Sequence, residues 1–297
     1  MTIEKCALIT ICGRPNVGKS TLTNALVGEK IAIVSSKPQT TRNRITGIVN
    51  RGGTQFVLMD TPGFHKARTR LGDYMVNVVK ESIPDVDLVL LLVEPIANVG
   101  PQETALLERI KAGGCPCVLV INKIDTVEKS ELLAVIAAYN AVFDFAAVVP
   151  ISAMRHDGTE TLLNEMERFA KPGPALFPED MDTDQPDRQV CAELVREKLL
   201  RCLDKEIPHG TAVEVTRFSE RDNGIIDLDV TIYCEKASHK GIIIGKNGAM
   251  LKKIGESARR DIERFMGTQV FLQTWVKVKE NWRDSDVLLK NFGYSDK

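Results

Sequence analysis

No hydrophobic stretch in the sequence is long enough to cross a membrane. A membrane-spanning helix needs about 20 mostly apolar residues, and the longest apolar stretch, from Val86 to Val93, is far shorter. A stretch of that length fits a strand buried inside a parallel sheet. The segment Met1–Lys5 includes an acidic residue and leads into an apolar strand pattern, so we expect no signal peptide.

Metal-binding patterns of cysteine and histidine are also missing. The seven cysteines form an odd set without a C-x-x-C pair, and the four histidines lie far apart. Cys12, Cys117, Cys191 and Cys202 fall inside apolar patterns, which is typical of small core residues. These features argue against a metal site built from cysteine or histidine, and they predict a protein of a reducing compartment, the cytoplasm.

The 297 residues divide into two regions that differ in their order of strand and helix patterns, and neither region contains an internal repeat. In residues 1–170, strand patterns alternate with helical patterns, which predicts an α/β domain with a mostly parallel sheet. Residues 171–186 are rich in proline and acid and predict a linker rather than a packed element. The strands expected in the first domain are 6–12, 45–50, 55–60, 87–93, 116–121 and 146–151, and the helices are 18–27, 70–82, 101–112, 129–141 and 157–170.

The second predicted domain, residues 187–297, has the order helix, strand, strand, helix, helix, strand. Its first helix, about 188–204, is expected to carry Glu197 and Lys198 on a charged side opposite an apolar one. The later expected elements are strands at 211–218 and 225–234, a long basic helix at 249–265, a strand at 269–278 and a short helix at 285–290.

The segment Gly13–Ser20 reads G-R-P-N-V-G-K-S and fits the pattern G-x-x-x-x-G-K-[ST]. In such a loop the glycines let the backbone bend so that several N–H groups point at a bound phosphate. Lys19 can reach the β- and γ-phosphates, and the Ser20 hydroxyl can bind Mg²⁺. A predicted strand precedes the loop, and a helix follows with its N-terminal dipole towards the phosphates. The segment therefore predicts a nucleotide site.

Two further segments can respond to the third phosphate of a nucleotide. In Asp60-Thr61-Pro62-Gly63, the carboxylate can hold Mg²⁺ and the glycine lets the backbone approach a γ-phosphate. Alone, this tetrapeptide could be an ordinary turn at the end of a strand. Upstream, Thr41 can bind Mg²⁺ with its hydroxyl and sense the γ-phosphate with its N–H; Thr40 is the alternative. The other interpretation of that segment is a polar loop with a hydroxyl-stabilised turn.

Asn122-Lys123-Ile124-Asp125 distinguishes guanine from adenine. Asp125 can accept hydrogen bonds from N1–H and the 2-amino group of guanine, a donor pair that adenine lacks. Asn122 would tie this segment to the phosphate loop, and the stem of Lys123 would cover the base. Ser152-Ala153-Met154 follows another apolar strand, and its backbone N–H groups could support the guanine oxygen.

The glutamine that many GTPases carry directly after D-x-x-G is absent. Its position is taken by Phe64, which cannot orient an attacking water. His65 could help, although a surface histidine in a loop is the other interpretation. We therefore predict slow intrinsic hydrolysis, with K⁺, RNA or a protein partner as candidate activators.

The loop Gly245-Lys246-Asn247-Gly248 lies between two predicted helices of the second domain. A G-x-x-G loop can approach a nucleic-acid backbone closely and clamp about four nucleotides. Lys246, Lys252 and Lys253 would contact phosphates, and the apolar Ile242–Ile244 would line the groove under the bases.

Residues 236–283 contain eleven Lys and Arg but four Asp and Glu, although the whole chain has a net charge of −1. This basic region predicts a polyanionic partner, with a solvated basic face or an acidic protein partner as the alternatives. Trp275 is expected in the core, and Trp282 is a candidate for stacking on a base.

Four motifs of the first domain, together with the C-terminal G-x-x-G region, resemble the Era family of bacterial ribosome-assembly GTPases. The four motifs are G-R-P-N-V-G-K-S-T-L-x-N, D-T-P-G, N-K-x-D and S-A. The resemblance covers essentially the whole chain, including Gln39-Thr40-Thr41-Arg42, Phe177-Pro178-Glu179-Asp180 and Trp275-Val276-Lys277-Val278-Lys279. It implies a P-loop GTPase domain followed by an α+β type II KH domain. It also implies GTP or GDP with Mg²⁺, binding near the 3′ end of 16S rRNA, and a role in maturing the 30S subunit. Peripheral inner-membrane association is implied by the resemblance alone, and we expect a monomer.

Carried over by position, the resemblance extends the expected sites. The residues expected to bind the nucleotide are Gly13, Arg14, Pro15, Asn16, Val17, Gly18, Lys19, Ser20, Thr21, Asp60, Thr61, Pro62, Gly63, Asn122, Lys123, Asp125, Ser152 and Ala153. The expected catalytic residues are Lys19, Thr41, Asp60 and Gly63, and the expected Mg²⁺ ligands are Ser20, Thr41 and Asp60. The expected RNA contacts are Ile242, Ile244, Gly245, Lys246, Asn247, Gly248, Lys252 and Lys253. Met154 has no expected role.

Three rival functions use the same residues differently. The second domain could bind a protein instead of RNA, the phosphate loop could belong to a metabolic kinase or ATPase, or the chain could be an RNA chaperone with vestigial nucleotide binding. Asn122 and Asp125 argue against the kinase, and the intact Lys19, Ser20 and Asp60 argue against the chaperone.

Overall fold

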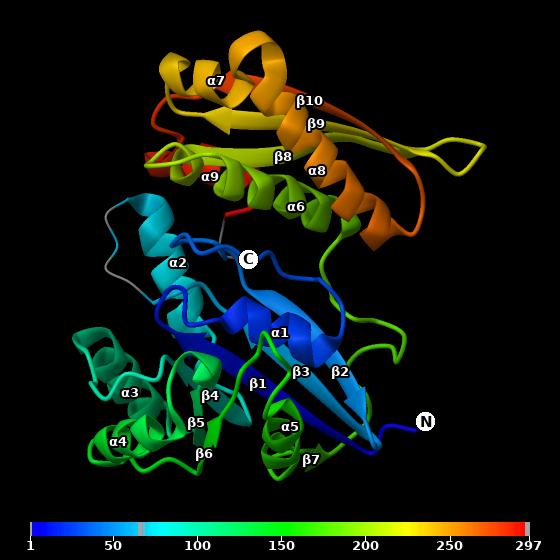
Figure 1. Cartoon of the computed structure of the whole chain (residues 1–297). Coiled ribbons are helices and arrows are strands. Elements are labelled where there is room, and N and C mark those ends of the chain that lie inside the picture. The colour runs from blue at the N-terminus through cyan, green and yellow to red at the C-terminus, as the bar shows by residue number, and fades with distance from the viewer. Residues whose placement is uncertain (1, 65–66, 68, 295–297) are drawn as a thin grey trace. The chain divides into compact units, whose positions relative to one another are not determined.

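A computed structural model describes residues 2–64, 67 and 69–294 (Figure 1). The chain forms two compact units. The first comprises residues 1–32, 41–67 and 75–184, and the second comprises residues 33–40, 68–74 and 185–297. Among the described residues, no helix combines the length and the apolar character needed to span a bilayer.

The first unit is built on a sheet with the strand order β2-β3-β1-β4-β5-β6. The strands that run parallel are β1 (Lys5–Gly13), β3 (Thr54–Asp60), β4 (Leu88–Val93), β5 (Cys117–Ile121) and β6 (Ala147–Pro150). Among the described strands of this sheet, β2 (Ile45–Arg51), which pairs with β3, and the two-residue β7 (Lys171–Pro172), which pairs with β1, are the two that run antiparallel to their neighbours. The predicted mostly parallel sheet is therefore confirmed.

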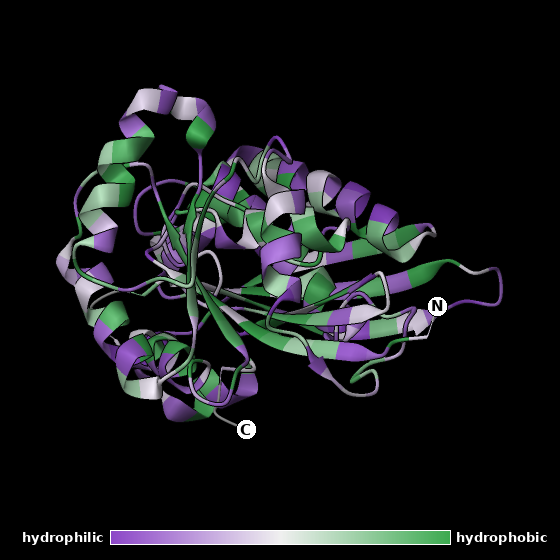
Figure 2. Cartoon of the chain, turned by 90° about the horizontal axis from the view of Figure 1, so that it is seen from below, coloured by the Kyte–Doolittle hydropathy of each residue, from purple (hydrophilic) through white to green (hydrophobic). Residues whose placement is uncertain are grey.

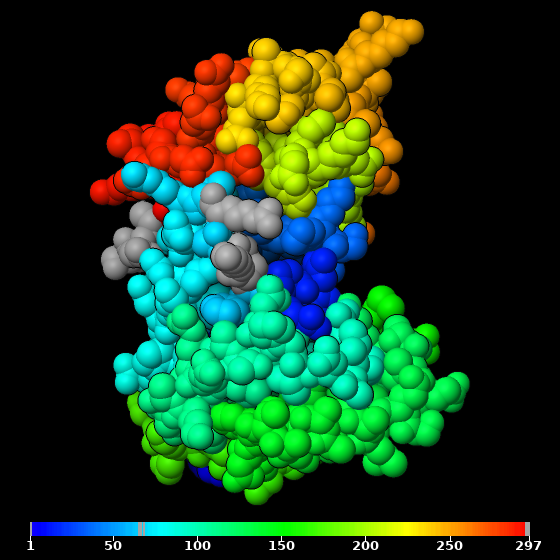
Figure 3. Space-filling view, turned by 90° about the vertical axis from the view of Figure 1, so that its left-hand side faces the viewer, coloured from blue at the N-terminus to red at the C-terminus, as the bar shows by residue number. Residues whose placement is uncertain are grey.

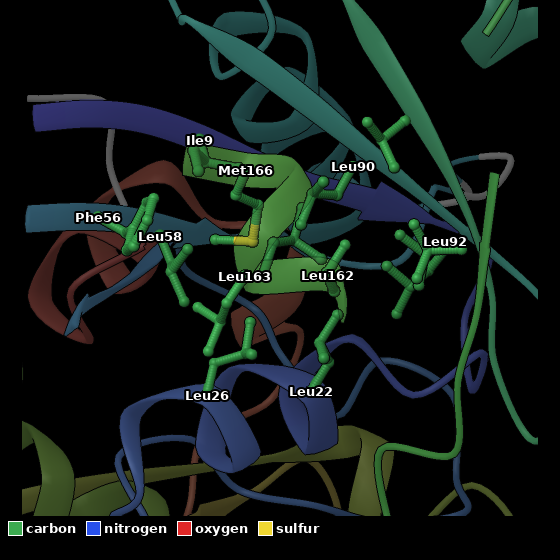
Figure 4. Packing of buried hydrophobic residues seen from close by; sticks show 14 of the residues in the cluster. Ile9, Leu22, Leu26, Phe56, Leu58, Leu90, Leu92, Leu162, Leu163 and Met166 are labelled. Carbon is green, nitrogen blue, oxygen red and sulfur yellow. The ribbon is translucent and has the colours of Figure 1, made fainter. Parts of the chain in front are cut away.

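Helices cover both faces of this sheet. One apolar cluster joins the strands to α1 (Lys19–Val27) and α5 (Thr159–Glu167), as the packing of Leu22, Leu162 and Met166 in Figure 4 shows. A second cluster lies against the other face and includes side chains from α2 (Arg70–Glu81), α3 (Pro101–Gly113) and α4 (Lys129–Asn140). All six residues of β4 are buried, as expected for a strand with helices on both faces. In Figure 2 much of the strands is green (hydrophobic), whereas the helices alternate between purple and green along their length.

The segment 171–184 belongs to the first unit and forms hydrogen bonds with its sheet, although none of its residues is buried. Buried Gln55 accepts hydrogen bonds from the backbone N–H groups of Leu176 and Phe177, at 2.8 and 3.0 Å. The Ile48 N–H donates to the Asp182 carbonyl at 2.9 Å. An extended, proline-rich backbone cannot form a helix, but its carbonyl and N–H groups can pair with an exposed sheet edge.

The second unit has a three-stranded sheet in the order β10-β9-β8. Strands β8 (Thr211–Glu220) and β9 (Ile226–Cys234) are antiparallel, whereas β10 (Val270–Val278) runs parallel to β9. Three helices share one apolar core with this sheet, namely α6 (Asp187–Cys202), α7 (Ala237–Ile244) and α8 (Ala249–Met266). The predicted order of helices and strands is confirmed. The remaining described elements are α9 (Asp286–Asn291) and the short 3-10 helices η1 (Ile124–Thr126), η2 (Pro208–Gly210), η3 (Lys246–Gly248) and η4 (Trp282–Asp284).

Both tryptophan predictions were wrong. Trp282 is fully buried, its indole N–H donates to the Gly210 carbonyl at 2.9 Å, and its ring packs against Phe292 and Tyr294. Trp275 is 43% exposed. Successive strand residues point to opposite faces. In β10, Val270 and Val276 point into the core, so Trp275, which precedes Val276, points to the other face.

Candidate functional site

The phosphate loop joins the end of β1 to the start of α1. A Cβ at Gly13, where φ is +152°, would lie 2.4 Å from the Leu92 carbonyl oxygen. At Gly18, where φ is +102°, a Cβ would lie 2.2 Å from the amide nitrogen of Asn122. Both positions combine a backbone conformation that favours glycine with a neighbour that leaves no room for a side chain. The loop geometry therefore depends on the two glycines of the motif.

Lys19 is buried at the first position of α1 and closes over this loop. Its ammonium donates to the carbonyl oxygens of Arg14 at 2.9 Å and Gly13 at 3.3 Å. Burial lowers the pKa of Lys19, and the nearby Asp60 carboxylate opposes this shift. A phosphate group in the loop would supply the negative charge that this buried ammonium favours.

Three side-chain oxygens meet beside the loop. The Ser20 hydroxyl lies 2.6 Å from Oδ2 of Asp60 and 2.8 Å from the Thr41 hydroxyl. Thr40 does not join them, because its hydroxyl donates to the Lys37 carbonyl. The structure thus brings Thr41 to this position.

These oxygens fit a magnesium ion, which prefers oxygen ligands. Oδ1 of Asp60 is buried and has no hydrogen-bond partner among the residues that the structure describes. Burial raises the pKa of Asp60 to about 6, while Lys19 and the Ser20 hydroxyl lower it. At neutral pH the carboxylate is therefore ionised, as a metal ligand must be.

The segment after β5 is joined to the phosphate loop by hydrogen bonds. The Asn122 amide donates to the Val17 carbonyl at 2.8 Å and accepts from the Ala153 N–H at 3.0 Å. The Lys123 ammonium donates to the Asn16 carbonyl at 2.7 Å. One asparagine thus links three of the predicted motifs.

Asp125 follows in the short helix η1. Its Oδ1 accepts a 2.7 Å hydrogen bond from the Ser152 hydroxyl, and Arg155 lies 3.5 Å from Oδ2. The Ser152 hydrogen bond is the main reason why the pKa of Asp125 is lowered. The side chain is therefore an ionised acceptor, which is the form needed to receive two N–H donors from guanine.

The D-T-P-G segment lies directly against the phosphate loop. A Cβ at Gly63 would come within 2.7 Å of Pro15 backbone atoms, and the Phe64 N–H donates to the Gly13 carbonyl at 3.1 Å. The Phe64 ring belongs to the apolar cluster against α2, α3 and α4, with the Arg109 guanidinium 5.3 Å from its centroid. The residue after Gly63 is thus a core residue, and His65 lies outside the described residues.

Sequence reasoning missed the buried carboxylate of Glu103. This residue lies in the first turn of α3, is 1% exposed and forms an ion pair with Arg14 of the phosphate loop. A glutamate in the first turn of a helix is common because it complements the helix dipole. No local pattern therefore distinguishes Glu103 from a solvated glutamate.

Sequence reasoning also missed the polar contacts between α6 and the segment 33–40, both in the second unit. Glu197 accepts from the Val34 N–H at 3.0 Å, and Arg201 donates to the Val34 carbonyl at 3.0 Å. Arg196 donates to the carbonyl of Thr40, the residue directly before Thr41. Arg196, Glu197 and Lys198 are all buried, so the charged residues expected on one side of this helix do not form a solvent-exposed surface.

The G-x-x-G loop connects α7 to α8 at the surface of the second unit, in yellow to orange in Figure 3. Gly245 is required by the fold, because a Cβ there would lie 2.9 Å from the Met250 backbone nitrogen. Gly248 also has a positive φ, +79°, but a Cβ there would meet no atom within 4 Å. Lys246 and Asn247 between them are exposed. The loop therefore presents two polar side chains and one glycine with open space around it.

A groove of about 480 Å³ lies beside this loop. It is lined by residues of α8 and β10, together with the last loop glycine, namely Gly248, Leu251, Lys252, Gly255, Glu256, Arg259, Leu272 and Thr274. Lys253 is exposed outside this lining. The expected apolar floor from Ile242 to Ile244 was wrong in part, since Ile243 is fully buried in the core while Ile242 is 50% exposed. Consecutive helix residues point in different directions, so three in a row cannot share one face.

Comparisons with known proteins give matches in both predicted domains of the chain. A family model described as a 50S ribosome-binding GTPase matches residues 8–123, and one described as a KH domain matches residues 206–283. The GTPase Era of Ruminiclostridium cellulolyticum is 52% identical over 290 residues, covering 98% of this chain and 97% of that protein. The GTPase Era of Clostridium botulinum strain Alaska E43 is 50% identical over 293 residues, covering 99% of each.

Two solved structures match over nearly the whole chain. One is Era in complex with MgGDPNP and nucleotides 1506–1542 of 16S ribosomal RNA, with a TM-score of 0.95, 34% identity and coverage of 99% of this chain and 100% of that one. The other is a point variant of Aquifex aeolicus Era bound to GDP and AlF4⁻, with a TM-score of 0.95, 35% identity and coverage of 98% and 100%.

Proposed function

We propose that this chain, which belongs to the Era family of GTPases, is a GTP-hydrolysing switch that binds the 3′ region of 16S rRNA and assists maturation of the 30S subunit. The observation that carries the proposal is the pairing of two sites in one chain. A guanine-nucleotide site with its magnesium ligands lies in one unit, and a basic G-x-x-G groove lies in the other. In this proposal the domain of residues 1–170 binds the nucleotide and the domain of residues 187–297 binds RNA. Residues 171–186 connect the two domains.

In the nucleotide site each residue has a defined task. Lys19 and the backbone N–H groups of the phosphate loop neutralise the β- and γ-phosphates. Ser20, Thr41 and Asp60 hold Mg²⁺, which when bound neutralises charge that develops on the phosphate oxygens. Asp125 selects guanine, and Gly63 approaches the γ-phosphate with its backbone.

Hydrolysis by the free chain is slow in this proposal, because the residue after Gly63 is a buried phenylalanine. K⁺ and the RNA partner are the candidate activators. Single-turnover hydrolysis of GTP by the free chain, in Na⁺ and in K⁺ buffers, measures this rate. A rate of several per second in Na⁺ without a partner would contradict the proposal.

The RNA site works by backbone contact. Gly248 lets the RNA backbone approach the loop, and Lys246, Lys252 and Lys253 contact phosphates. The nucleotide controls this site by ordering the loops near Thr41 and Gly63 when GTP is bound and releasing them after hydrolysis. What supports such control is that α6 binds the segment directly before Thr41.

The test is the affinity for a short single-stranded RNA that copies the 3′ end of 16S rRNA. It is measured with a non-hydrolysable GTP analogue and with GDP, for the wild type, Gly248→Asp and Lys19→Ala. We expect tighter binding in the GTP state, loss of RNA binding with intact GTP hydrolysis in Gly248→Asp, and loss of nucleotide binding in Lys19→Ala. Absence of RNA binding by the wild type in both nucleotide states would favour a protein partner for the second domain. Displacement of GTP by an equal concentration of ATP would exclude a guanine-specific switch.

The proposal places the protein in the cytoplasm as a monomer. Contact with the inner membrane is part of the proposal only through the family, because nothing in the composition shows it. Gel filtration and flotation with vesicles test these two points.

A further inference from the structure

Gly255 lies in the interior of α8, where glycine is normally unfavourable. Glycine loses more backbone freedom on folding than alanine, so it weakens a helix unless its lack of a side chain is needed. In the second unit Gly255 is not needed for packing, since a Cβ built there would meet no heavy atom within 4 Å. The φ of Gly255 is not positive either, so an alanine fits its backbone conformation.

The open space at Gly255 is part of the groove beside the G-x-x-G loop. Gly248, Leu251, Gly255 and Arg259 line this groove at intervals of three or four residues, so they share one side of α8. The opposite wall is formed by Leu272 and Thr274 of β10.

The groove has the chemistry of a nucleobase site. Leu251 and Leu272 offer apolar contacts to a flat ring, while the charged side chains of the lining are the basic Lys252 and Arg259 and the acidic Glu256. Strand β10 is at an edge of the described three-stranded sheet, and an edge strand has unpaired backbone N–H and C=O groups that can bond to a base. A methyl group on α8 at position 255 would project into this space.

We propose that Gly255 is an RNA-binding position of this groove, because its missing side chain lets one nucleobase lie flat against the backbone of α8. This inference depends on the proposed function, since it assigns a role to one residue within the proposed RNA groove. The ligand that it requires is a single-stranded segment, because a base paired in a duplex does not expose its face.

Gly255→Ala separates a role in RNA binding from a structural role. The first predicts that the melting temperature rises, and the second predicts that it falls. Alanine stabilises the helix, so we expect the melting temperature of the KH domain to rise by about 2–4 °C. We expect the affinity for the 16S 3′-end RNA to fall by about tenfold or more, on the scale of losing the contact of one base. GTP binding by the same variant should stay unchanged.

Gly241→Ala is the matched control. Gly241 lies in the interior of α7, a Cβ there also meets no heavy atom within 4 Å, and the residue does not line the groove. The same substitution should therefore stabilise the domain and leave RNA affinity at the wild-type value.

RNAs with a single abasic position complete the test. At one position, removing the base should weaken binding to the wild type and leave the affinity of Gly255→Ala unchanged, whereas at other positions both proteins should lose equally. If Gly255→Ala binds the intact RNA as tightly as the wild type, or melts at a lower temperature, the inference is wrong and the proposed function stands. If the wild type itself does not bind the RNA, the proposed function fails and this inference fails with it.

Discussion

Asp125 and Phe64 show how single side chains set the chemistry of the nucleotide site. Asp125 is held as an ionised acceptor by the Ser152 hydroxyl, which is why we propose that it selects a base that presents two donors. Phe64 is buried in the core behind the phosphate loop, so it contributes packing instead of a water-orienting group. One residue can thus be assigned by hydrogen-bond chemistry and the other by its burial.

At this scale, Asp125→Asn should change which base is bound. An amide offers one acceptor and one donor, so guanine loses at least one of its two hydrogen bonds, and GTP affinity should fall by at least about 100-fold. The amide can instead donate to the 2-oxo group of xanthine, so affinity for xanthosine triphosphate should rise. Competition binding with GTP, ATP and xanthosine triphosphate measures both changes.

Asp144→Asn is the control for this prediction, because Asp144 is exposed and has no place in the nucleotide site. Its nucleotide preference should match the wild type. If Asp125→Asn kept its GTP affinity, the guanine would have to be selected elsewhere in the chain.

Among the elements, α6 departs furthest from its sequence pattern. Its charged residues Arg196, Glu197 and Lys198 are buried, and their partners include the segment 33–40 and Asp261 of α8. Buried charges are tolerated only when they are paired and hydrogen-bonded. The helix is therefore held in its place by a polar network as well as by its apolar side chains, which include Leu194, Leu199 and Leu200.

Glu197→Ala should destabilise the second unit strongly. The substitution leaves Lys198 and the Val34 N–H without the carboxylate that each contacts, and breaking a buried pair costs about 3–5 kcal/mol. Urea unfolding followed by tryptophan fluorescence should show a large fall in the midpoint with little change in slope.

Asp204→Ala tests the same chemistry at the surface. Its side chain is 90% exposed and pairs with Lys37 at 3.2 Å, so its loss should cost no more than about 1 kcal/mol. If Glu197→Ala and Asp204→Ala lowered the stability equally, burial of the α6 network would not contribute to the stability of the second unit.

For the whole molecule, the net charge of −1 hides a strong asymmetry. Residues 236–283 carry seven more basic than acidic residues, so the rest of the chain is acidic. This basic region contains the G-x-x-G loop and the groove lining. A polyanion should therefore be attracted to one region of a nearly neutral protein.

The salt dependence of RNA binding measures this asymmetry. If Lys246, Lys252 and Lys253 each contact one phosphate of single-stranded RNA, the logarithm of the affinity should fall against the logarithm of salt concentration with a slope of about −2. Lys252→Ala should make the slope smaller by about 0.7. Lys129→Ala, an exposed lysine of α4, should leave it unchanged, and a wild-type slope near zero would mean that phosphates are not contacted.

Features that depend on residue type at a fixed spacing could be predicted without coordinates. The glycines and lysine of the phosphate loop, Asn122 and Asp125, the strand–helix alternation and the G-x-x-G loop between two helices are such features. Their backbone conformations are set largely by near neighbours in the chain, so a local pattern is enough to indicate them. Family membership follows from the same segments.

Which side chains are buried, and which distant residues meet, became known only from the folded chain. The structure buries Trp282 and exposes Trp275, joins residues 171–184 to the sheet by hydrogen bonds, pairs Glu103 with Arg14 and buries Glu197. It also shows that the space beside Gly255 is open. Burial depends on contacts between segments far apart in the sequence, and a single residue pattern carries no information about what will pack against it.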